Sequence, residues 1–512
     1  MMAHESIAGR VVRNIGRNTI YQIGSQVAPA FAAIAAIPFL LRHLGSEVFG
    51  IVTIFSTALI YFTMLDLGLG RAATRFIAQS LESGRRDDLR RYFWGSIILL
   101  SGIGVIVSGG CLIGVSTFVS SYLKIPIAYF HAASESFYIL CLTVPVVTLT
   151  GTLRGFLEAS DRFLYISIVT GLSGVSMYGL PALVVLMGGG LVAVAAAFAL
   201  VRVAMCGALA IGCLRVEGRP SLRPIFDVTA VRRMLSFGGW LSVSNIVGSA
   251  MIYCDRFLLG VLVGMAAVTS YGMPLDVIGR LQILITSFCA VLFPLMSRLD
   301  ESGSAQFQTV YRGAVAISLS LMTLLTTAGV VAAPIVMKLW LGDRSTSDAV
   351  FAAQVFLAGA VVQSIASIAW TALHARGRSD LTAWIHLAEF PLYCGAFYFA
   401  ATRFGVRGAA LAWLGRGIVD FLCMVVLLRI QRGGRGFSIP PELVAALVSV
   451  GILLIASLPL GEAAMTAVLV CALAWAWTWR TLLDPAVRTQ LAIVLLGRQN
   501  LDRPVNNLGD VG

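Results

Sequence analysis

Ionisable side chains lie inside long apolar runs of this sequence. A charge in an apolar segment is costly, so such a residue usually faces protein or water and marks a binding site or an ion pathway. Arginine stays charged at any working pH and binds phosphate oxygens bidentately, whereas a carboxylate there can exchange a proton or bind a cation. The residues of this kind are Arg202, Asp255, Arg256, Asp276, Arg280, Glu389, Arg416 and Asp420, with Asp66 at the end of another apolar run.

Two of these acids have an arginine four residues away. Asp276 precedes Arg280, and Arg416 precedes Asp420, at the spacing that brings two side chains together on one helix face. Each pair could therefore neutralise itself, and a purely structural role is an alternative to a binding role.

The other charges need partners from elsewhere in the chain. Asp255 and Arg256 are adjacent and point to different sides of a helix, and Arg202 has no acid within one turn. Such residues are better candidates for a charged cavity. Proton or sodium coupling is predicted for three acids, Asp255, Asp276 and Glu389.

Composition defines the class of protein. Of the 512 residues, 58% are hydrophobic and 12% are charged, about half the charged fraction of a soluble domain. The net charge of +12 comes from basic residues spread over short loops, which favours membrane topology over nucleic-acid binding. The nine cysteines include no CxxC pair and lie mostly in apolar runs, so neither disulfides nor metal ligands are expected.

About fourteen membrane-spanning helices are predicted from the apolar runs. Their ranges are 18–41, 48–67, 92–119, 136–156, 163–187, 191–214, 236–262, 266–294, 311–338, 349–372, 381–401, 407–429, 441–460 and 463–482. Most of the 37 lysines and arginines fall on one side of the membrane if both termini are cytoplasmic, and the positive-inside rule favours that orientation. The leader 1–17 is interpreted as part of a retained signal anchor.

The segment Leu44–Ala78 predicts a change from spanning to surface structure. Its apolar run from Val48 to Leu65 stops at the sequence DLGLG, where two glycines loosen the helix. Arg71 and Arg75 follow on one helical face, as in a segment lying at lipid headgroups. Asp66, Arg71 and Arg75 are therefore assigned to a cytoplasmic gate or to a structural role, and a simple helix end is the alternative.

A parallel repeat is also visible in the sequence. The sequence FLL at 39–41, followed by Gly45, recurs as FLL at 257–259, followed by Gly264. Two six-helix bundles would give this pattern, with the substrate site between them, although apolar helices can resemble each other by chance. The predicted units are 1–214 and 236–430, an inter-lobe segment 215–235, helices thirteen and fourteen within 431–483, and a polar tail 484–512.

Two motifs resemble a known family. The sequence LG-x-E-x-FG at 44–50 and LDLGLG-x4-RF at 65–76 are similar to the polysaccharide flippases, the Wzx-type branch of the multidrug/oligosaccharidyl-lipid/polysaccharide exporter superfamily. The resemblance implies two six-helix lobes in a V, with helices one, two, seven and eight lining the cavity. It also implies a lipid-linked oligosaccharide as substrate, moved by alternating access across the bacterial inner membrane for O-antigen, capsule or exopolysaccharide assembly.

The resemblance also ranks the site residues. Arginines would bind the substrate pyrophosphate, with Arg256 and Arg280 favoured over Arg202 and Arg416. Sugar-binding or cavity-lining residues would come from the same helices, although packing is an alternative for each. These polar residues are Asn18, Gln22, Ser25, Gln26, Thr53, Ser56, Tyr61, Ser242, Ser244, Asn245 and Tyr271.

Other functions compete with this one. A lipid II flippase and a drug/cation antiporter belong to the same superfamily. A membrane glycosyltransferase or polymerase is disfavoured because no long extramembrane loop carries acidic residues, and no P-loop indicates ATP hydrolysis. The expected protein is therefore not an enzyme and has no cofactor, metal or nucleic-acid partner. Its expected partners are membrane lipids, an H⁺ or Na⁺ gradient, and a polysaccharide polymerase with a chain-length regulator.

Overall fold

The structure is a computed structural model of the whole chain. It describes residues 7–64, 69–216, 223–302, 304–430, 447–448, 450–452, 454–455 and 458–481. Every regular element among these residues is helical. Ten segments of this part of the chain are long and apolar enough to cross a membrane, which confirms the predicted class, an all-α multi-pass membrane protein.

The first half of the chain contains α1 to α7. Their bounds are α1 Ile7–Met64, α2 Leu69–Glu82, α3 Arg86–Thr117, α4 Phe130–Leu142, α5 Val144–Ala159, α6 Phe163–Leu186 and α7 Leu191–Leu214. Two short elements, η1 Phe118–Tyr122 and η2 Ile127–Tyr129, connect α3 to α4.

The second half contains the remaining elements. They are α8 Val228–Leu262, α9 Met265–Ile278, η3 Gly279–Leu281, α10 Gln282–Ser302, α11 Ser304–Leu341, η4 Gly342–Arg344, α12 Ser347–Ala375, α13 Ser379–Ile430 and α15 Leu460–Thr481. The predicted helix 463–482 corresponds to α15, while much of the predicted helix 441–460 lies outside the described residues.

Two of the longest elements are helical hairpins. Within α1 the backbone turns at Gly45, whose φ is 80°, and within α13 it turns at Gly405, whose φ is 59°. Positive φ is readily adopted by glycine, so each glycine lets the chain reverse inside an apolar stretch. Each hairpin has a first arm before this glycine and a second arm after it. The two arms of α1 correspond to the predicted helices 18–41 and 48–67, and those of α13 to the predicted helices 381–401 and 407–429.

The predicted helix 266–294 is interrupted in the middle. Helix α9 ends at Ile278, η3 makes a tighter turn, and α10 begins at Gln282. Pro274 lies inside α9 and removes one hydrogen bond of its ladder, although the helix continues to Ile278. The interruption matters for the site because Arg280 lies within η3.

Two helices begin earlier than predicted, and polar residues form their first turns or caps. Helix α3 starts at Arg86, with Asp87 and Asp88 in its first turn, where acids favour the helix dipole. Asp227 caps α8 by accepting hydrogen bonds from the Thr229 and Ala230 amides. Hydrogen bonds from the Thr229 hydroxyl and from the Ala230 and Thr229 amides hold the pKa of the Asp227 carboxyl below its ordinary value. The positive charge of nearby Arg91 acts in the same direction.

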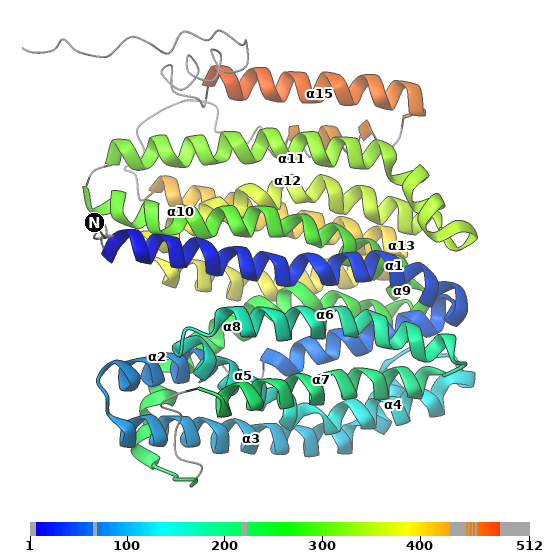
Figure 1. Cartoon of the computed structure of the whole chain (residues 1–512). Helices are drawn as coiled ribbons and strands as arrows, with labels where there is room; N and C mark the ends of the chain where they lie inside the picture. Colours follow the sequence, from blue (N-terminus) through cyan, green and yellow to red (C-terminus); the bar gives the residue numbers. More distant parts are fainter. Residues whose placement is uncertain are drawn as a thin grey trace, which may run out of the picture.

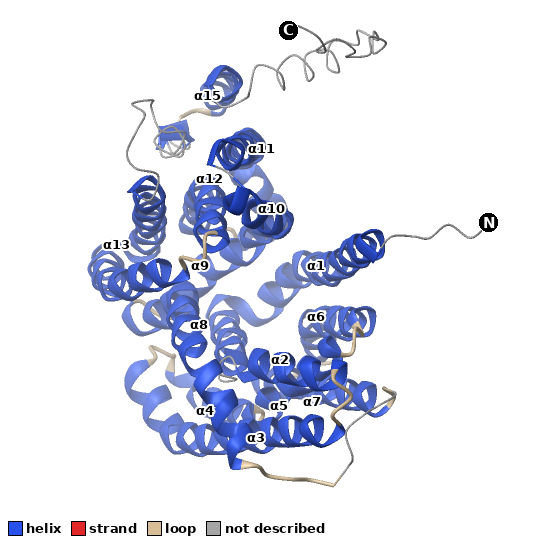
Figure 2. Ribbon diagram, turned by 90° about the vertical axis from the view of Figure 1, so that its left-hand side faces the viewer, coloured by secondary structure: helices blue, strands red, loops and turns tan. Residues whose placement is uncertain are grey.

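The long helices run side by side across the molecule, with α3, α4 and α7 at one edge and α11 and α15 at the other (Figure 1). Figure 2, turned by 90°, shows α2 to α7 together on one side and α10 to α13 together on the other. One apolar core consists of residues from the first half together with Val231 and Met234 at the start of α8, and a second consists of residues beyond 284. A third contains residues of both halves. The predicted boundary at 215–235 stays a prediction, and α8 begins inside that segment.

Contacts between the two halves gather near the turns that end α1's first arm and α8. Thr269 on α9 donates to the Ser46 carbonyl at 2.5 Å. The backbone amide of Lys124 donates to the Gly260 carbonyl at 3.2 Å, and its Nζ donates to the Leu262 carbonyl at 2.5 Å. In this conformation these contacts hold the halves together at one end of the molecule.

Candidate functional site

Arg256 forms the centre of a buried charged cluster. Its Nη2 donates to Asp276 Oδ1 at 2.5 Å, and its Nη1 donates to Thr57 Oγ1 at 3.3 Å. These groups come from α8, α9 and the second arm of α1. Arg256 is only 4% exposed, whereas the Asp276 side chain is 28% exposed. The buried guanidinium therefore connects three helices through its ion pair and its hydrogen bond.

Asp255 faces a different side of α8, as predicted, and connects that helix to α9. Its Oδ2 accepts a hydrogen bond from the Tyr271 hydroxyl at 2.6 Å, and its Oδ1 accepts one from the Arg256 amide at 2.7 Å. Both Asp255 and Tyr271 are fully buried. The ring of Tyr271 contacts Phe356 and Phe397 edge-on, which fixes the position of its hydroxyl.

Arg280 reaches from the second half of the chain to the first. It lies in η3, and its Nη2 donates to the hydroxyl of Tyr178 on α6 at 3.2 Å. Tyr178 was not among the predicted residues. A phenol within an apolar run is the signal that could have indicated it, because a buried tyrosine hydroxyl usually needs a partner.

An apolar groove of 330 Å³ runs beside Arg280. Two helices provide its walls, α1 through Val27, Ala30, Phe31 and Ile34, and α10 through Ile283, Leu284 and Ser287. Phe31 and Leu284 are exposed on the molecular surface. The groove therefore places one guanidinium next to a strip of hydrocarbon side chains.

The expected pairs within single helices do not form. Asp276 forms its ion pair with Arg256 instead of Arg280, because η3 interrupts the helix between the two residues. Asp420 lies 3.3 Å from His386, while Arg416 lies over the ring of Tyr393 at 5.4 Å. Spacing by four was therefore a poor guide to both pairs.

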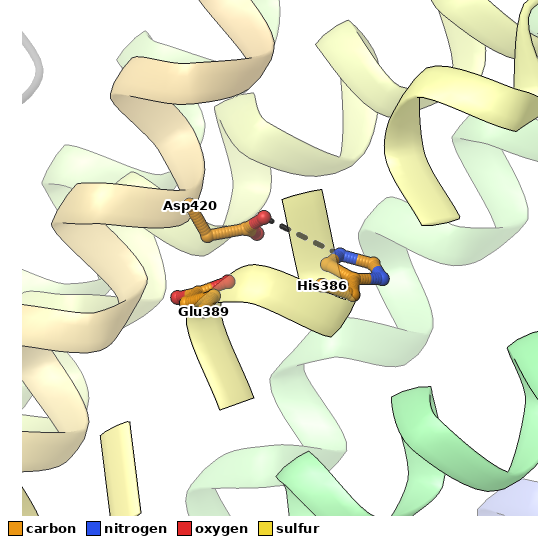
Figure 3. A group of neighbouring side chains, drawn as sticks. All are labelled: His386, Glu389 and Asp420. Atoms are coloured by element: carbon orange, nitrogen blue, oxygen red, sulfur yellow. Dashed lines mark ion pairs between the residues drawn. The ribbon is translucent and has the colours of Figure 1, made fainter. Parts of the chain in front are cut away.

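Three other charged candidates lie outside the Arg256 cluster. Arg202 on α7 and Arg416 on α13 are half-buried, and the Nε of each has no hydrogen-bond partner among the described residues. Glu389, on the first arm of α13, is buried beside His386 and Asp420 (Figure 3).

The predicted polar residues divide into several groups. Thr53 and Tyr271 are buried and donate to protein acceptors, so they do not line an open surface in this conformation. Tyr61 is half-buried and donates to the Ala250 carbonyl at 3.3 Å. Gln26 is exposed, whereas Ser25 and Ser56 are half-buried, and Ser56 donates to the Thr53 carbonyl. The side chains of Asn18, Gln22, Ser242, Ser244 and Asn245 lie outside the described residues.

The segment after Asp66 forms a short helix, α2. Asp66 and the Arg71 side chain lie outside the described residues, and Arg75 is exposed. The opposite face of α2 packs on protein, since Ala73 and Ile77 are fully buried. A Cβ at Gly155 on α5 would lie 2.5 Å from Thr74 Oγ1, which shows how closely the two helices approach.

These features define a multi-pass membrane protein in which an arginine meets an apolar groove where the two halves of the chain face each other. Residues 15–300, more than half of the chain, match the family described as "Polysaccharide biosynthesis protein". The chain belongs to this family.

A curated protein of Shigella flexneri, named "Putative O-antigen transporter", is 28% identical over 417 residues, which cover 80% of this chain and 97% of that protein. Among solved structures, "Lipid II flippase MurJ, inward closed conformation" gives a TM-score of 0.67 at 12% identity and covers 94% of this chain and 99% of its own. An inward-facing multidrug resistance MATE family transporter of the MOP superfamily gives 0.63 at 15% identity, covering 85% and 95%. These structural likenesses concern the fold.

Proposed function

We propose that this protein is a flippase that moves an undecaprenyl-pyrophosphate-linked oligosaccharide from the cytoplasmic to the periplasmic leaflet of the bacterial inner membrane, by alternating access. The family and the Shigella flexneri relative support the polysaccharide class of substrate. Both termini are assigned to the cytoplasm from the distribution of basic residues.

The observation that carries the proposal is the position of Arg280 at the apolar groove between α1 and α10. A polyprenyl pyrophosphate has a long hydrocarbon tail and an anionic head. The groove offers apolar contacts to the tail, and the guanidinium offers bidentate hydrogen bonds to phosphate oxygens. Neither a neutral glycan nor a cationic drug needs both features together.

Arg280 is a better phosphate ligand than Arg256 in this conformation. Arg256 is buried and already bound to Asp276 and Thr57, so a substrate could reach it only by breaking an ion pair. Arg280 donates to a neutral phenol, Tyr178. A phosphate can replace this acceptor with a stronger, charge-assisted one.

Coupling to an H⁺ or Na⁺ gradient is part of the proposal, and the three predicted acids differ in the hydrogen bonds that they accept within the protein. Asp255 and Asp276 already accept hydrogen bonds or form an ion pair within the protein. Glu389 accepts no hydrogen bond from a described residue. It is therefore the acid most available to an ion. The protein is proposed to act as a transporter without enzymatic activity, alongside a polymerase and a chain-length regulator.

The test is transport in a deletion strain complemented with wild type or Arg280→Ala, with equal protein in the membrane. Lipid-linked repeat units are expected to accumulate on the cytoplasmic face of the deletion strain. Arg280→Ala should reduce their release about tenfold or more, because it removes a charge-assisted contact to phosphate. Arg280→Lys should retain part of the activity, since it keeps the charge and loses the bidentate geometry.

Arg407→Ala is the matched control, because Arg407 forms an exposed ion pair with Asp348 away from the groove. It should complement as well as wild type. If Arg280→Ala also does so, Arg280 does not bind the phosphate. If deletion leaves surface glycan unchanged and alters peptidoglycan synthesis or drug sensitivity, the substrate is that of a lipid II flippase or an antiporter.

A further inference from the structure

The hairpin of α13 brings three side chains together that are far apart in sequence. His386 and Glu389 lie three residues apart on one face of its first arm, and Asp420 lies on its second arm. Figure 3 shows the His386 ring directed toward Asp420, with the Glu389 carboxylate below that of Asp420. The turn at Gly405 produces this arrangement.

The distances within this group suit a shared ion. One ligand atom from each residue can be chosen so that all three lie within 4.8 Å of one another. His386 Nε2 lies 3.3 Å from Asp420 Oδ1. Two ligands about 2.0–2.1 Å from a tetrahedral metal are separated by roughly 3.3 Å.

Hydrogen bonds do not satisfy these carboxylates. Glu389 is 5% exposed, and neither of its carboxylate oxygens accepts a hydrogen bond from the described residues. Asp420 is 8% exposed, and its Oδ1 also lacks a hydrogen bond despite the proximity of the His386 ring. A buried carboxylate in this state either takes up a proton or binds a cation.

The number and type of ligands indicate which cation. Two carboxylates with a neutral imidazole are balanced by a charge of +2, whereas a proton or sodium ion balances only one of them. The neighbouring Arg416 lies over Tyr393 and forms no ion pair within 4 Å of either carboxylate in the described structure. Imidazole nitrogen favours first-row transition metals, whereas alkali and alkaline-earth ions favour oxygen ligands alone.

We infer that His386, Glu389 and Asp420 form a binding site for a divalent transition-metal cation such as Mn²⁺ or Zn²⁺. Three protein ligands leave at least one coordination position open to water. The side chain of His386 is 25% exposed, which gives the ion a route from the surface. The bound ion joins the two arms of α13 near their ends at Ser379 and Ile430, whatever substrate the protein carries. A divalent ion held there takes Glu389 out of the proposed H⁺ or Na⁺ coupling, which then falls to Asp255 or Asp276.

Metal binding to the purified full-length chain tests this inference. The protein carries a tag without histidines, is stripped with a chelator, and is titrated with Mn²⁺, which is less prone than Zn²⁺ to bind the nine cysteines. About one Mn²⁺ per chain is expected by equilibrium dialysis with elemental analysis. Saturation should raise the unfolding temperature by roughly 2–4 °C.

Glu389→Gln and Asp420→Asn preserve side-chain shape and remove charge, so each should weaken Mn²⁺ binding by more than about tenfold. His386→Gln serves as a third variant at a partly exposed position, should either of the others fold poorly. Asp348→Asn is the control, because it removes a carboxylate from an exposed ion pair and should leave binding unchanged.

Equal Mn²⁺ binding by wild type and all three site variants would overturn the inference. A second result would also overturn it: the wild-type unfolding temperature rises equally with 100 mM Na⁺ and with Mn²⁺, and Glu389→Gln shows neither rise. That result defines an alkali-ion site. These outcomes are independent of glycan transport, so failure of the metal site and failure of the proposed flippase function can be distinguished.

Discussion

At the scale of single residues, the buried charges serve two purposes. Asp255 and Arg256 are adjacent in sequence but are held by different partners, Tyr271 for the acid and Asp276 with Thr57 for the base. Removing one partner from a buried ionic group leaves an unsatisfied charge, which costs more than the pair contributes. These residues stabilise the contact among α1, α8 and α9, whereas Arg280 and Glu389 remain available to ligands.

Tyr271→Phe should lower the free energy of unfolding by about 1–3 kcal/mol. The change keeps the aromatic contacts with Phe356 and Phe397 and removes the hydroxyl that donates to fully buried Asp255. Thermal unfolding in detergent measures the effect. Tyr398→Phe, at a side chain exposed on α13, is the control. Equal stability of the two variants would show that the Asp255 contact contributes little.

At the scale of elements, glycines set how closely α1 approaches α9. A Cβ at Gly50 would lie 2.0 Å from the Met265 carbonyl oxygen, which is a backbone atom. The start of α9 therefore packs directly on the backbone of α1's second arm. A small residue at such a position permits the close helix contacts on which membrane bundles depend.

Gly50→Ala should sharply reduce the yield of folded protein, because α1 and α9 must separate to accommodate the new methyl group. Gly102→Ala is the matched control. Its Cβ meets no atom within 4 Å, and alanine is the better helix former by about 1 kcal/mol. Size-exclusion chromatography of detergent extracts compares the two variants. A normal yield of monodisperse Gly50→Ala would contradict the close packing.

At the scale of the whole molecule, two sets of polar contacts join the two halves of the chain. Lys124 and Thr269 connect the halves at one end, while Arg280 and Tyr178 connect them near the groove. The proposed alternating access requires each set of contacts to break in turn. The end joined by Lys124 and Thr269 is called the closed end. Its small number of polar contacts is compatible with such an opening.

A crosslink at the closed end should stop transport. In a cysteine-free background, Lys124→Cys with Leu262→Cys introduces two thiols on the segments that the hydrogen bond from Lys124 Nζ to the Leu262 carbonyl now joins. A short bifunctional thiol reagent should abolish release of lipid-linked glycan, because the halves can no longer separate there. Each single-cysteine variant treated in the same way should remain active. Full transport by the crosslinked pair would exclude opening at this end.

The sequence by itself determined the class of protein and most of its helices. Apolar length alone is enough for this, because a chain in lipid must satisfy its backbone hydrogen bonds internally and so forms helices. The motifs at 44–50 and 65–76 also indicated the family. The ionisable candidates were selected because charge is rare in apolar runs, and their binding roles stay predictions. Tyr178 and His386 were not among them.

Only the tertiary structure decided which charges act together. The distance between Arg256 and Asp276, between Arg280 and Tyr178, or between Glu389 and Asp420 depends on how separate helices pack, and a local spacing rule contains no information about it. The rule of four residues predicted Asp276 with Arg280 and Arg416 with Asp420, yet η3 interrupts the first pair and the second packs differently. Long-range packing thus separates the structural charges from those free to bind a ligand.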